Sequence, residues 1–501
     1  MAGAVGCRVA FAAGGCLNLL EAFDDLLQGW RPAFAQVRTF TRARRLTLGL
    51  LVCMRRHLTS QAICATGRQF VDGTSDYRLC SRCVWDPRQL FDPVFDRLSP
   101  LLSSPDAAVM VAVDDTLCRK SRKKKIPGVT LARDPQSPAF RVNFCYGLRF
   151  VQLSVLIPPE LPGPARALPV RFELAPPAEK PKKGASAEEQ AAYRQEKKKR
   201  ALTVVGRNAM ASVRQSMDQR EGLHYRQLIL CGDGSYTNAN VLKHLPERTT
   251  YIGRIRKDAK LHWPLEQAGQ KAKGRPRRYG AVAPTPEQIL HDESVPWVKV
   301  WCFVAGELRH VSVKVVGPVY WRKAGVAMPL QVVVIRPAGY RLRNGSKLLY
   351  RQPAFLIGTD GKLDLQTLVQ AYVYRWEIEC NHRDEKSLLG VGQGQVRNPE
   401  AVRRLPQLQV ASYSLLLLAT LLSSGSERTA EFLPLPKWRR QPIRTSVLDI
   451  LALLREQIFA RVMSGSQNPL LSFDCIAAQA ALDAKSTKKP LAADTLCTAA
   501  A

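Results

Sequence analysis

Acidic residues are scarce in this sequence. Its 501 residues include 42 aspartates and glutamates against 74 lysines and arginines, which gives a formal net charge of +32. An enzyme of small molecules has no need of such an excess, whereas a polyanion is bound more tightly each time a basic side chain neutralises a phosphate and releases counterions. Because the basic residues are spread over the whole chain and not confined to one amphipathic helix, nucleic acid is favoured over a membrane surface.

Long hydrophobic runs and paired cysteine motifs are missing as well. The longest apolar run, LLLLATLL at 415–422, is too short to cross a bilayer and predicts a buried helix, so we expect no membrane association. The 13 cysteines are scattered, mostly within apolar runs, as is typical of reduced thiols in a cytoplasmic protein. Cys80 and Cys83 form a lone CxxC, which indicates two structural cysteines near a turn more often than a zinc site.

Hydrophobic residues, at 46% of the chain, are sufficient for a large core. Residues 17–104 show helical periodicity with basic flanks and no strand alternation, which predicts an N-terminal helical domain. Such a domain either binds DNA or covers the core. After residue 475 the chain is rich in alanine, lysine and threonine, and we expect a frayed tail.

Two apolar runs each lead to an aspartate. The run AAVMVAVDD at 107–115 ends in Asp114 and Asp115, and LILCGD at 228–233 ends in Asp233. Both runs are typical of central strands that deliver acids at their carboxyl ends. Between them, residues 140–158 predict a hairpin of long strands, and 158–200 predict a proline-rich surface loop leading into a charged helix that continues to about residue 219.

Strand signals dominate from residue 251 to 364 and indicate hairpins in a β-rich insertion. Within it lies the basic stretch KAKGRPRRYG at 271–280, which suits contact with phosphates or the minor groove of DNA. A solvated charged loop is the plainer interpretation. The candidate DNA contacts in this loop are Lys271, Lys273, Arg275, Arg277 and Arg278.

The stretch YVYRWEIECNHRDEK at 372–386 carries a tyrosine, an arginine, a glutamate and a lysine at i, i+3, i+7 and i+14. On one continuous helix these side chains lie within roughly 60° of one another. That face could hold a metal ion and a phosphate together, or it could be an ordinary solvated helix. The residues are Tyr372, Arg375, Glu379 and Lys386.

Three carboxylates therefore stand out: Asp114, Asp233 and Glu379. Each alone is more often a cap or a turn residue. Together, two strand ends and one helix can converge at a sheet edge and bind two Mg²⁺ ions, which prefer oxygen ligands. Such a metal pair activates the attacking oxygen and stabilises the leaving oxygen of a phosphodiester.

These motifs resemble those of bacterial insertion-sequence transposases with a DDE triad. The four residues of 372–386 match the family signature Y-(2)-R-(3)-E-(6)-K, VAVDDT resembles its first-acid motif, and LILCGDGSYTNANVL resembles its second. The stretches RWEIE, KSLLGVGQGQVRNPEAVRR and PKWRR are similar too, so the resemblance runs from about residue 35 to 455.

The resemblance implies an α/β fold: a ribonuclease-H-like core with a β-rich insertion before the glutamate helix. We then expect a helical, DNA-binding domain at 17–104, core segments at 105–250 and 365–425, the insertion at 251–364, a helical region at 426–475 and a disordered tail at 476–501.

The resemblance also implies roles for the candidate residues. Asp114, Asp233 and Glu379 would ligate Mg²⁺ or Mn²⁺, while Tyr372, Arg375 and Lys386 would hold phosphates beside the cleaved bond. Asp114 is followed by one residue and a threonine, as in the family, and Asp115 is its rival. Cys380 and His382 are read as neighbours, not ligands. A flipped base could stack on one of four tryptophans: Trp263, Trp297, Trp301 and Trp321.

The expected activity is cut-and-paste transposition in the cytoplasm of a bacterium, close to the nucleoid. The expected partners are double-stranded DNA, namely terminal inverted repeats and target DNA, and a second copy of the chain that pairs the two ends as a homodimer. Three alternatives stay open: a related metal-dependent DNA nuclease, a decayed or domesticated DNA-binding protein without catalysis, and a nucleic-acid-binding protein explained by charge alone.

Overall fold

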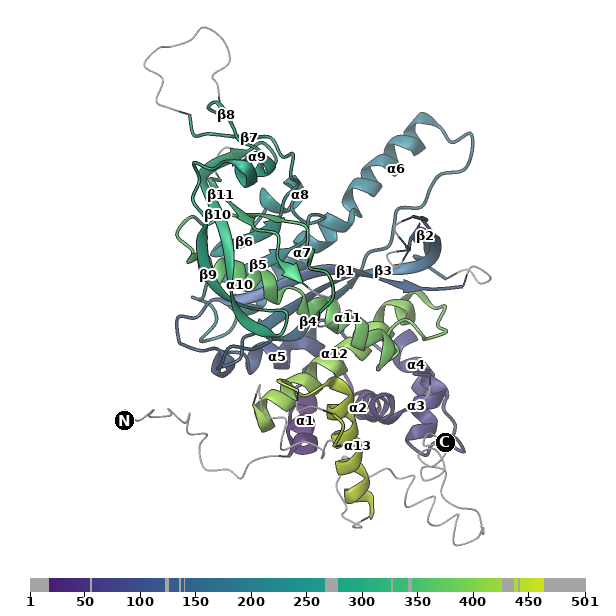
Figure 1. The fold of residues 1–501 in the computed structure, drawn as a ribbon. Coiled ribbons are helices and arrows are strands. Elements are labelled where there is room, and N and C mark those ends of the chain that lie inside the picture. Colours follow the sequence, from purple (N-terminus) through teal and green to yellow (C-terminus); the bar gives the residue numbers. More distant parts are fainter. Residues whose placement is uncertain are drawn as a thin grey trace, which may run out of the picture.

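The computed structural model describes residues 18–463, apart from 55, 122–125, 135–136, 139, 266–277, 326–327, 341–344, 426–436 and 440–441. A large mixed sheet forms its centre, with helices on both faces (Figure 1). The prediction of an α/β fold is therefore confirmed.

The N-terminal part, as predicted, is helical. It consists of α1 (Leu19–Gln28), α2 (Val37–Val52), α3 (Thr59–Ala65), α4 (Thr74–Ser81), α5 (Asp92–Asp96) and the 3-10 turns Arg31–Ala33, Gln89–Phe91 and Ser99–Leu101. Helix α1 begins at Asn18, whose side chain accepts from the N–H of Glu21 in a capping box. These helices lie beside α12 (Pro399–Ser424) and α13 (Val447–Met463) in Figure 1 and share one apolar core with them.

Five strands form the part of the sheet that carries the acids. They are β1 (Val109–Arg119), β3 (Phe144–Ile157), β4 (Arg166–Leu174), β5 (Leu228–Gly232) and β6 (Thr249–Arg254). The strands lie in the order β4-β3-β1-β5-β6: the pairs β4–β3 and β3–β1 are antiparallel, whereas β5 and β6 run parallel to β1. The short β2 (Thr130–Arg133) pairs with the beginning of β3.

The strands of the predicted insertion continue the same sheet. Strand β14 (Ala354–Gly358) pairs with β6 and is followed by β11 (Leu330–Ile335) and β10 (Glu307–Trp321), which also pairs with β9 (Val298–Val304). Strands β7 (Leu261–His262) and β8 (Val282–Ala283), helix α9 (Pro286–His291) and the hairpin of β12 (Gly339–Tyr340) with β13 (Leu349–Tyr350) complete this region. The predicted boundary between residues 250 and 251 falls inside β6.

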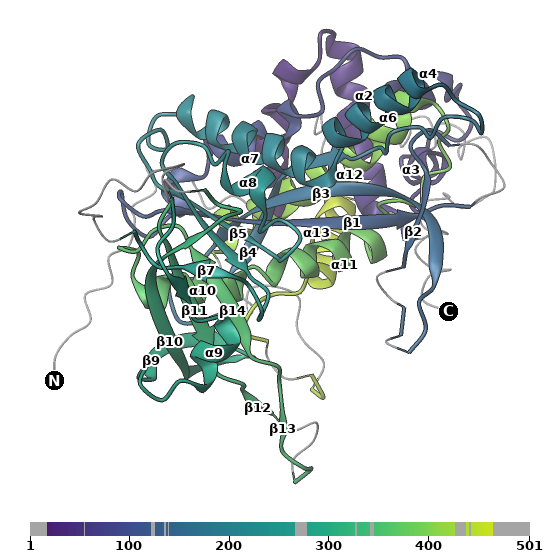
Figure 2. The same cartoon turned by 90° about the horizontal axis from the view of Figure 1, so that it is seen from above.

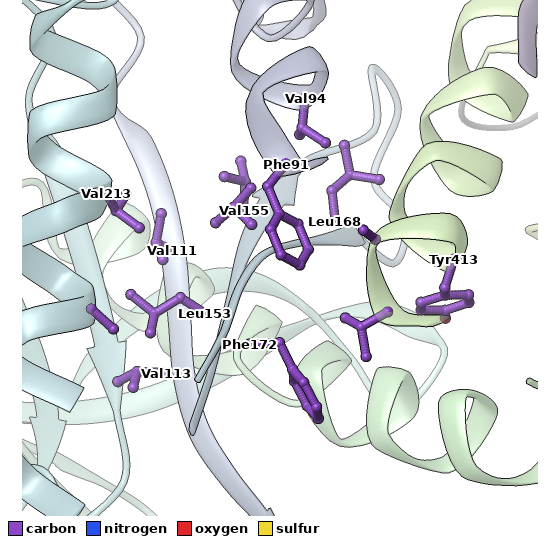
Figure 3. Packing of buried hydrophobic residues seen from close by; sticks show 14 of the residues in the cluster. Phe91, Val94, Val111, Val113, Leu153, Val155, Leu168, Phe172, Val213 and Tyr413 are labelled. Carbon is purple, nitrogen blue, oxygen red and sulfur yellow. The ribbon is translucent and has the colours of Figure 1, made fainter. Parts of the chain in front are cut away.

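Helices cover the two faces of β1 and β3. On one face α7 (Leu202–Asp218) packs its Val213 near Val111 and Val113 of β1 (Figure 3). On the other, α10 (Leu365–Tyr374) and α11 (Glu377–Ser387) place Tyr374 and Ile378 against Ala112. Figure 2 shows α7 and α11 on opposite sides of these strands, with α8 (Ala239–Leu242) beside α7.

Helix α12 contains the apolar run noted in the sequence. By length and composition it is the one helix among the described residues that could cross a membrane, but 94% of its apolar window is buried inside the protein. Tyr413 lies on it within the packed core, and Phe172 of β4 belongs to the same core (Figure 3). Burial of this kind is typical of the core helix of a globular protein.

Three details of the predicted secondary structure were wrong. Residues 144–157 form one strand, β3, and the predicted surface loop contains β4, whose Pro169 faces Ser154 beside a register shift. The predicted charged helix is two helices, since α6 (Ala187–Lys199) ends at Lys199, with Arg200 as its C-cap, and α7 begins at Leu202. Helix α6 has no buried residue and projects from the body of the protein (Figure 1).

Candidate active site

Asp114 and Asp233 lie at the same end of the pairing between β1 and β5. The last residue pair of the parallel β1–β5 ladder is Val113 with Gly232, and each aspartate is the next residue of its chain segment. Because the two strands are parallel, both acids lie where their pairing ends. The sequence suggested that β1 ends at this point. It continues instead, because β3 pairs with it as far as Arg119.

Asp114 and Asp115 point to opposite faces, since neighbours in a strand alternate. Asp114 lies on the α11 side, with its Oδ2 3.4 Å from Nη1 of Arg375. Asp115 has its Oδ2 3.3 Å from Nη1 of Arg149, and its charge acts on Tyr236 of the α7 side. The sequence did not decide between Asp114 and Asp115 as the first acid. The fold places the two side chains on opposite faces of the sheet, with Asp114 on the side of Glu379.

Arg375 joins two of the three candidate acids. Its Nη2 donates to Oε1 of Glu379 at 3.0 Å while its Nη1 approaches Asp114, and its guanidinium lies 5.7 Å from the ring centre of Tyr372. Burial lowers the pKa of Arg375, but Tyr372, Asp114 and Glu379 together raise it above its ordinary value. Three of the four signature residues therefore meet around one guanidinium.

The prediction of one continuous helix through the signature was wrong. Helix α10 ends at Tyr374, α11 begins at Glu377, and the N–H of Trp376 bonds to Val373 O, a 3-10 contact. Arg375 caps the first helix and Glu379 stands in the first turn of the second. Lys386, in the last turn of α11, lies seven residues or about 10 Å further along. It faces a cavity at the end of β1.

Asp233 caps its own turn. One carboxylate oxygen accepts from the Ser235 N–H at 2.9 Å and the other from the Ser235 hydroxyl at 3.1 Å. This is the plain role that a single acid after a strand usually has. Its charge nevertheless reaches Asp114 and Asp115 and helps to raise the pKa of both.

The environment of Asp114 disfavours an unpaired negative charge. Burial raises the pKa of Asp114 to about 6, although His382 and Arg375 act in the opposite direction, and Asp233 adds to the rise. Burial also raises the pKa of Asp115, against the effect of Arg149. Desolvated carboxylates that repel one another are stabilised by a cation, which here is Arg375.

His382 is a neighbour of the site that the sequence reading set aside. It is buried, its Nδ1 lies 3.5 Å from Oε2 of Glu385, and its Nε2 has no hydrogen-bond partner among the described residues. It stands three residues after Glu379 and therefore on the same face of α11. The spacing of three residues from Glu379 could have indicated from the sequence that His382 lies near the acids, where it acts to lower the pKa of Asp114.

The donors of the three acids suit a hard divalent cation, since Mg²⁺ and Mn²⁺ prefer carboxylate oxygen. Within the described residues, however, no three His, Cys, Asp or Glu side chains are grouped closely enough to hold a metal ion. The guanidinium of Arg375 stands between Asp114 and Glu379. A metal bound by both acids would therefore require this guanidinium to move.

The other predicted residues lie apart from this centre. Arg278 is exposed, and Lys271, Lys273, Arg275 and Arg277 lie outside the described residues. Trp321 is buried, Trp263 and Trp297 are half-buried, and Trp301 is 46% exposed and stacked on His310. Cys80 packs in the core, and burial raises the pKa of its thiol to about 12, which does not favour the thiolate that zinc binds.

We expect Asp114 to make the metal-free protein less stable as the pH rises. Its pKa of about 6 in the folded protein exceeds the ordinary value of 3.8, so the folded state binds the proton more tightly and the free energy of unfolding falls between about pH 4 and 6. Asp114→Asn should therefore be more stable to unfolding than wild type in EDTA at pH 7.5, by on the order of 2 kcal/mol, and by less than half as much at pH 4.5. A stabilisation confined to pH 4.5 in thermal melts would contradict this assignment.

Comparison with known families supplies an independent finding. A protein-family model described as DDE superfamily endonuclease matches residues 32–301, more than half of the chain. The match includes β1 with Asp114 and β5 with Asp233, and it ends before α11 and Glu379. No curated protein matches the chain.

Proposed function

Because the chain belongs to the DDE superfamily of endonucleases, we propose that it is the DNA transposase of a bacterial insertion sequence. The family implies a DNA substrate and metal-dependent cleavage. The observation that carries the finer proposal is the guanidinium of Arg375, which contacts both Asp114 of β1 and Glu379 of α11, while the charge of Asp233, directly after β5, acts on Asp114. Acids 265 residues apart in the sequence are thus gathered at one end of a parallel strand pair.

The strand order supports a ribonuclease-H-like core. Three antiparallel strands, β4-β3-β1, are followed by β5 and β6, which run parallel to β1. Asp114 lies in β1, the middle strand of this set, and Asp233 directly follows the neighbouring strand β5. The strands β7 to β14 enter the chain between β6 and α10, which is where the proposed core would accept its insertion.

In this proposal Asp114, Asp233 and Glu379 hold the metal ions. When bound, two divalent ions lower the pKa of an attacking water or hydroxyl and stabilise the leaving oxygen of the phosphodiester. Arg375 has a further part: released from the carboxylates, its fork of donors fits two oxygens of a phosphate. Tyr372 lies against the guanidinium and would keep it aimed at the DNA, and Lys386 adds a point charge further along α11.

The remaining expectations belong to the same proposal. The protein would act in the bacterial cytoplasm on inverted repeats at the element's ends and on target DNA, as a homodimer that pairs two ends. The excess of basic residues supports a DNA partner. The match of Tyr372, Arg375, Glu379 and Lys386 to the transposase signature favours this function over a nuclease that only hydrolyses DNA or a DNA-binding relic.

The test is cleavage of a labelled duplex that carries the element's own end. We expect cutting at the element's boundary with Mg²⁺ or Mn²⁺ and no cutting in EDTA, while binding to the end persists without metal. A duplex of scrambled end sequence is the control. Equal cutting of both duplexes would indicate a nuclease, and binding without cutting under any metal condition would indicate a relic.

A further inference from the structure

A cavity of about 670 Å³ opens beyond the acids, where β1 ends. Four separate parts of the chain contribute to its walls: the end of β1, the segment around β2 with Ile126 and Asp134, the last turn of α11 with the following loop, and Arg56 from the segment after α2. Cys118, in its wall, lies on the same face of β1 as Asp114, four residues further along. The cavity is therefore in line with the candidate active site.

Hydrogen bonds fix the wall formed by the loop after α11. Nζ of Lys120 donates to the carbonyl oxygens of Gly392 at 2.5 Å and Gly394 at 2.8 Å, and the N–H of His57 donates to Oε1 of Gln393 at 3.0 Å. Gly392 has φ +91°, and a Cβ there would lie 2.9 Å from Cβ of Cys118. Glycine is thus required for the loop to lie directly on β1, and the cavity is a built feature.

The walls are strongly basic. Five cationic side chains line the cavity, against the single carboxylate of Asp134. Two of the five are already engaged: Arg119 pairs with Asp134 at 2.7 Å, and Lys120 holds the loop. Within the part of the chain that the structure describes, no carboxylate lies within ion-pair distance of the other three, Arg56, Lys386 and Arg397.

Three cations without carboxylate partners around one concave surface repel one another and attract anions. A cavity of this volume could also hold a small molecule. The exposed positions of Arg56 and Arg397 favour instead an anion that passes along the surface and meets several cations in succession. The backbone of a nucleic acid is such an anion.

The spacing from the acids indicates which part of the DNA would lie there. Cys118 is about 13 Å from Asp114 along β1, and Lys386 is about 10 Å from Glu379 along α11. One strand of B-form DNA carries a phosphate about every 3.4 Å along its axis. We propose that this cavity binds the DNA backbone about three to four nucleotides from the cleaved bond, with Arg56 and Arg397 as phosphate contacts. This inference rests on the proposed function and adds two residues to its DNA contacts.

The experiment compares Arg56→Gln/Arg397→Gln with wild type in binding to the element's end in EDTA. We expect affinity to fall roughly tenfold at 0.15 M salt and the slope of log K against log salt to become shallower by about two. Lys243→Gln/Lys362→Gln removes the same charge from exposed positions outside the cavity and should leave the slope unchanged. All four side chains are exposed, so these variants should fold, which thermal melting checks.

A second arm locates the contact on the DNA. A neutral methylphosphonate placed three or four nucleotides from the cleavage site should weaken binding to wild type but not weaken binding to the double variant further. If wild type cuts the element's end but Arg56→Gln/Arg397→Gln has the same slope of log K against log salt as wild type, the cavity proposal is overturned and the proposed function stands. Wild type that neither binds nor cuts the end would overturn both.

Discussion

Replacing Glu379 by glutamine should abolish DNA cleavage while leaving DNA binding nearly intact. The amide keeps the size of the side chain and its bond to Arg375, but it removes the negative charge that a divalent ion needs. Loss of one metal ligand should lower the cleavage rate by about 10³-fold or more, whereas binding to the element's end should change by less than about threefold. Single-turnover cleavage with Mn²⁺ and a gel-shift assay in EDTA measure the two quantities separately.

Glu377→Gln is the matched control, because Glu377 lies in the same turn of α11 but pairs with Arg444 at 2.9 Å instead of Arg375. It should cut at close to the wild-type rate. The result matters because Glu379 lies outside the stretch matched by the family model, 32–301. If Glu379→Gln cut as fast as wild type, the third acid would have to be sought elsewhere on α11, where Asp384 and Glu385 are both buried.

The sequence was sufficient to predict the strands that deliver the aspartates. Continuous apolar runs before Asp114 and Asp233 leave few alternatives to central strands, and β1 and β5 are buried and parallel. Strand β4 was not predicted, because the prolines around it indicated a surface loop. Pro169 lacks an N–H, yet it is tolerated here because β4 pairs with β3 alone and the proline stands beside a register shift. Pairing of this kind is decided by the partner strand and leaves no local signal.

The signature residues show the same limit. Their spacing predicts one helix face, but neither glycine nor proline marks the break at Arg375–Trp376. The long side chain of Arg375 spans the break and still reaches Glu379, so the local grouping was predictable although the helix was not. The position of Lys386 is set by α11 alone, and that helix carries it to the cavity and away from Arg375. Arg56 could not have been selected from the sequence, because only the fold carries it to the end of β1.

Asparagine substitutions at Asp114 and Asp115 should give opposite results, and this pair of variants decides the first acid. Asp114→Asn should lower the cleavage rate by about 10³-fold or more, because the side chain faces Arg375 and Glu379 and would hold metal there. Asp115→Asn should keep cleavage within about tenfold of wild type, because Asp115 faces Arg149 on the other side of β1. Asp115→Asn should leave the melting temperature at neutral pH unchanged or higher, because burial raises the pKa of the Asp115 carboxyl above its ordinary value.

Metal binding gives a readout that misfolding would not reproduce. Titration of Mn²⁺ followed by electron paramagnetic resonance should show weakened binding in Asp114→Asn and wild-type binding in Asp115→Asn, with both proteins folded by circular dichroism. The opposite pattern would assign the metal to the α7 face of β1, where Glu379 does not lie, and the grouping of acids around Arg375 would then be a structural ion pair. Because adjacent residues of a strand cannot both face α11, only the first pattern fits a metal ion that is shared with Glu379.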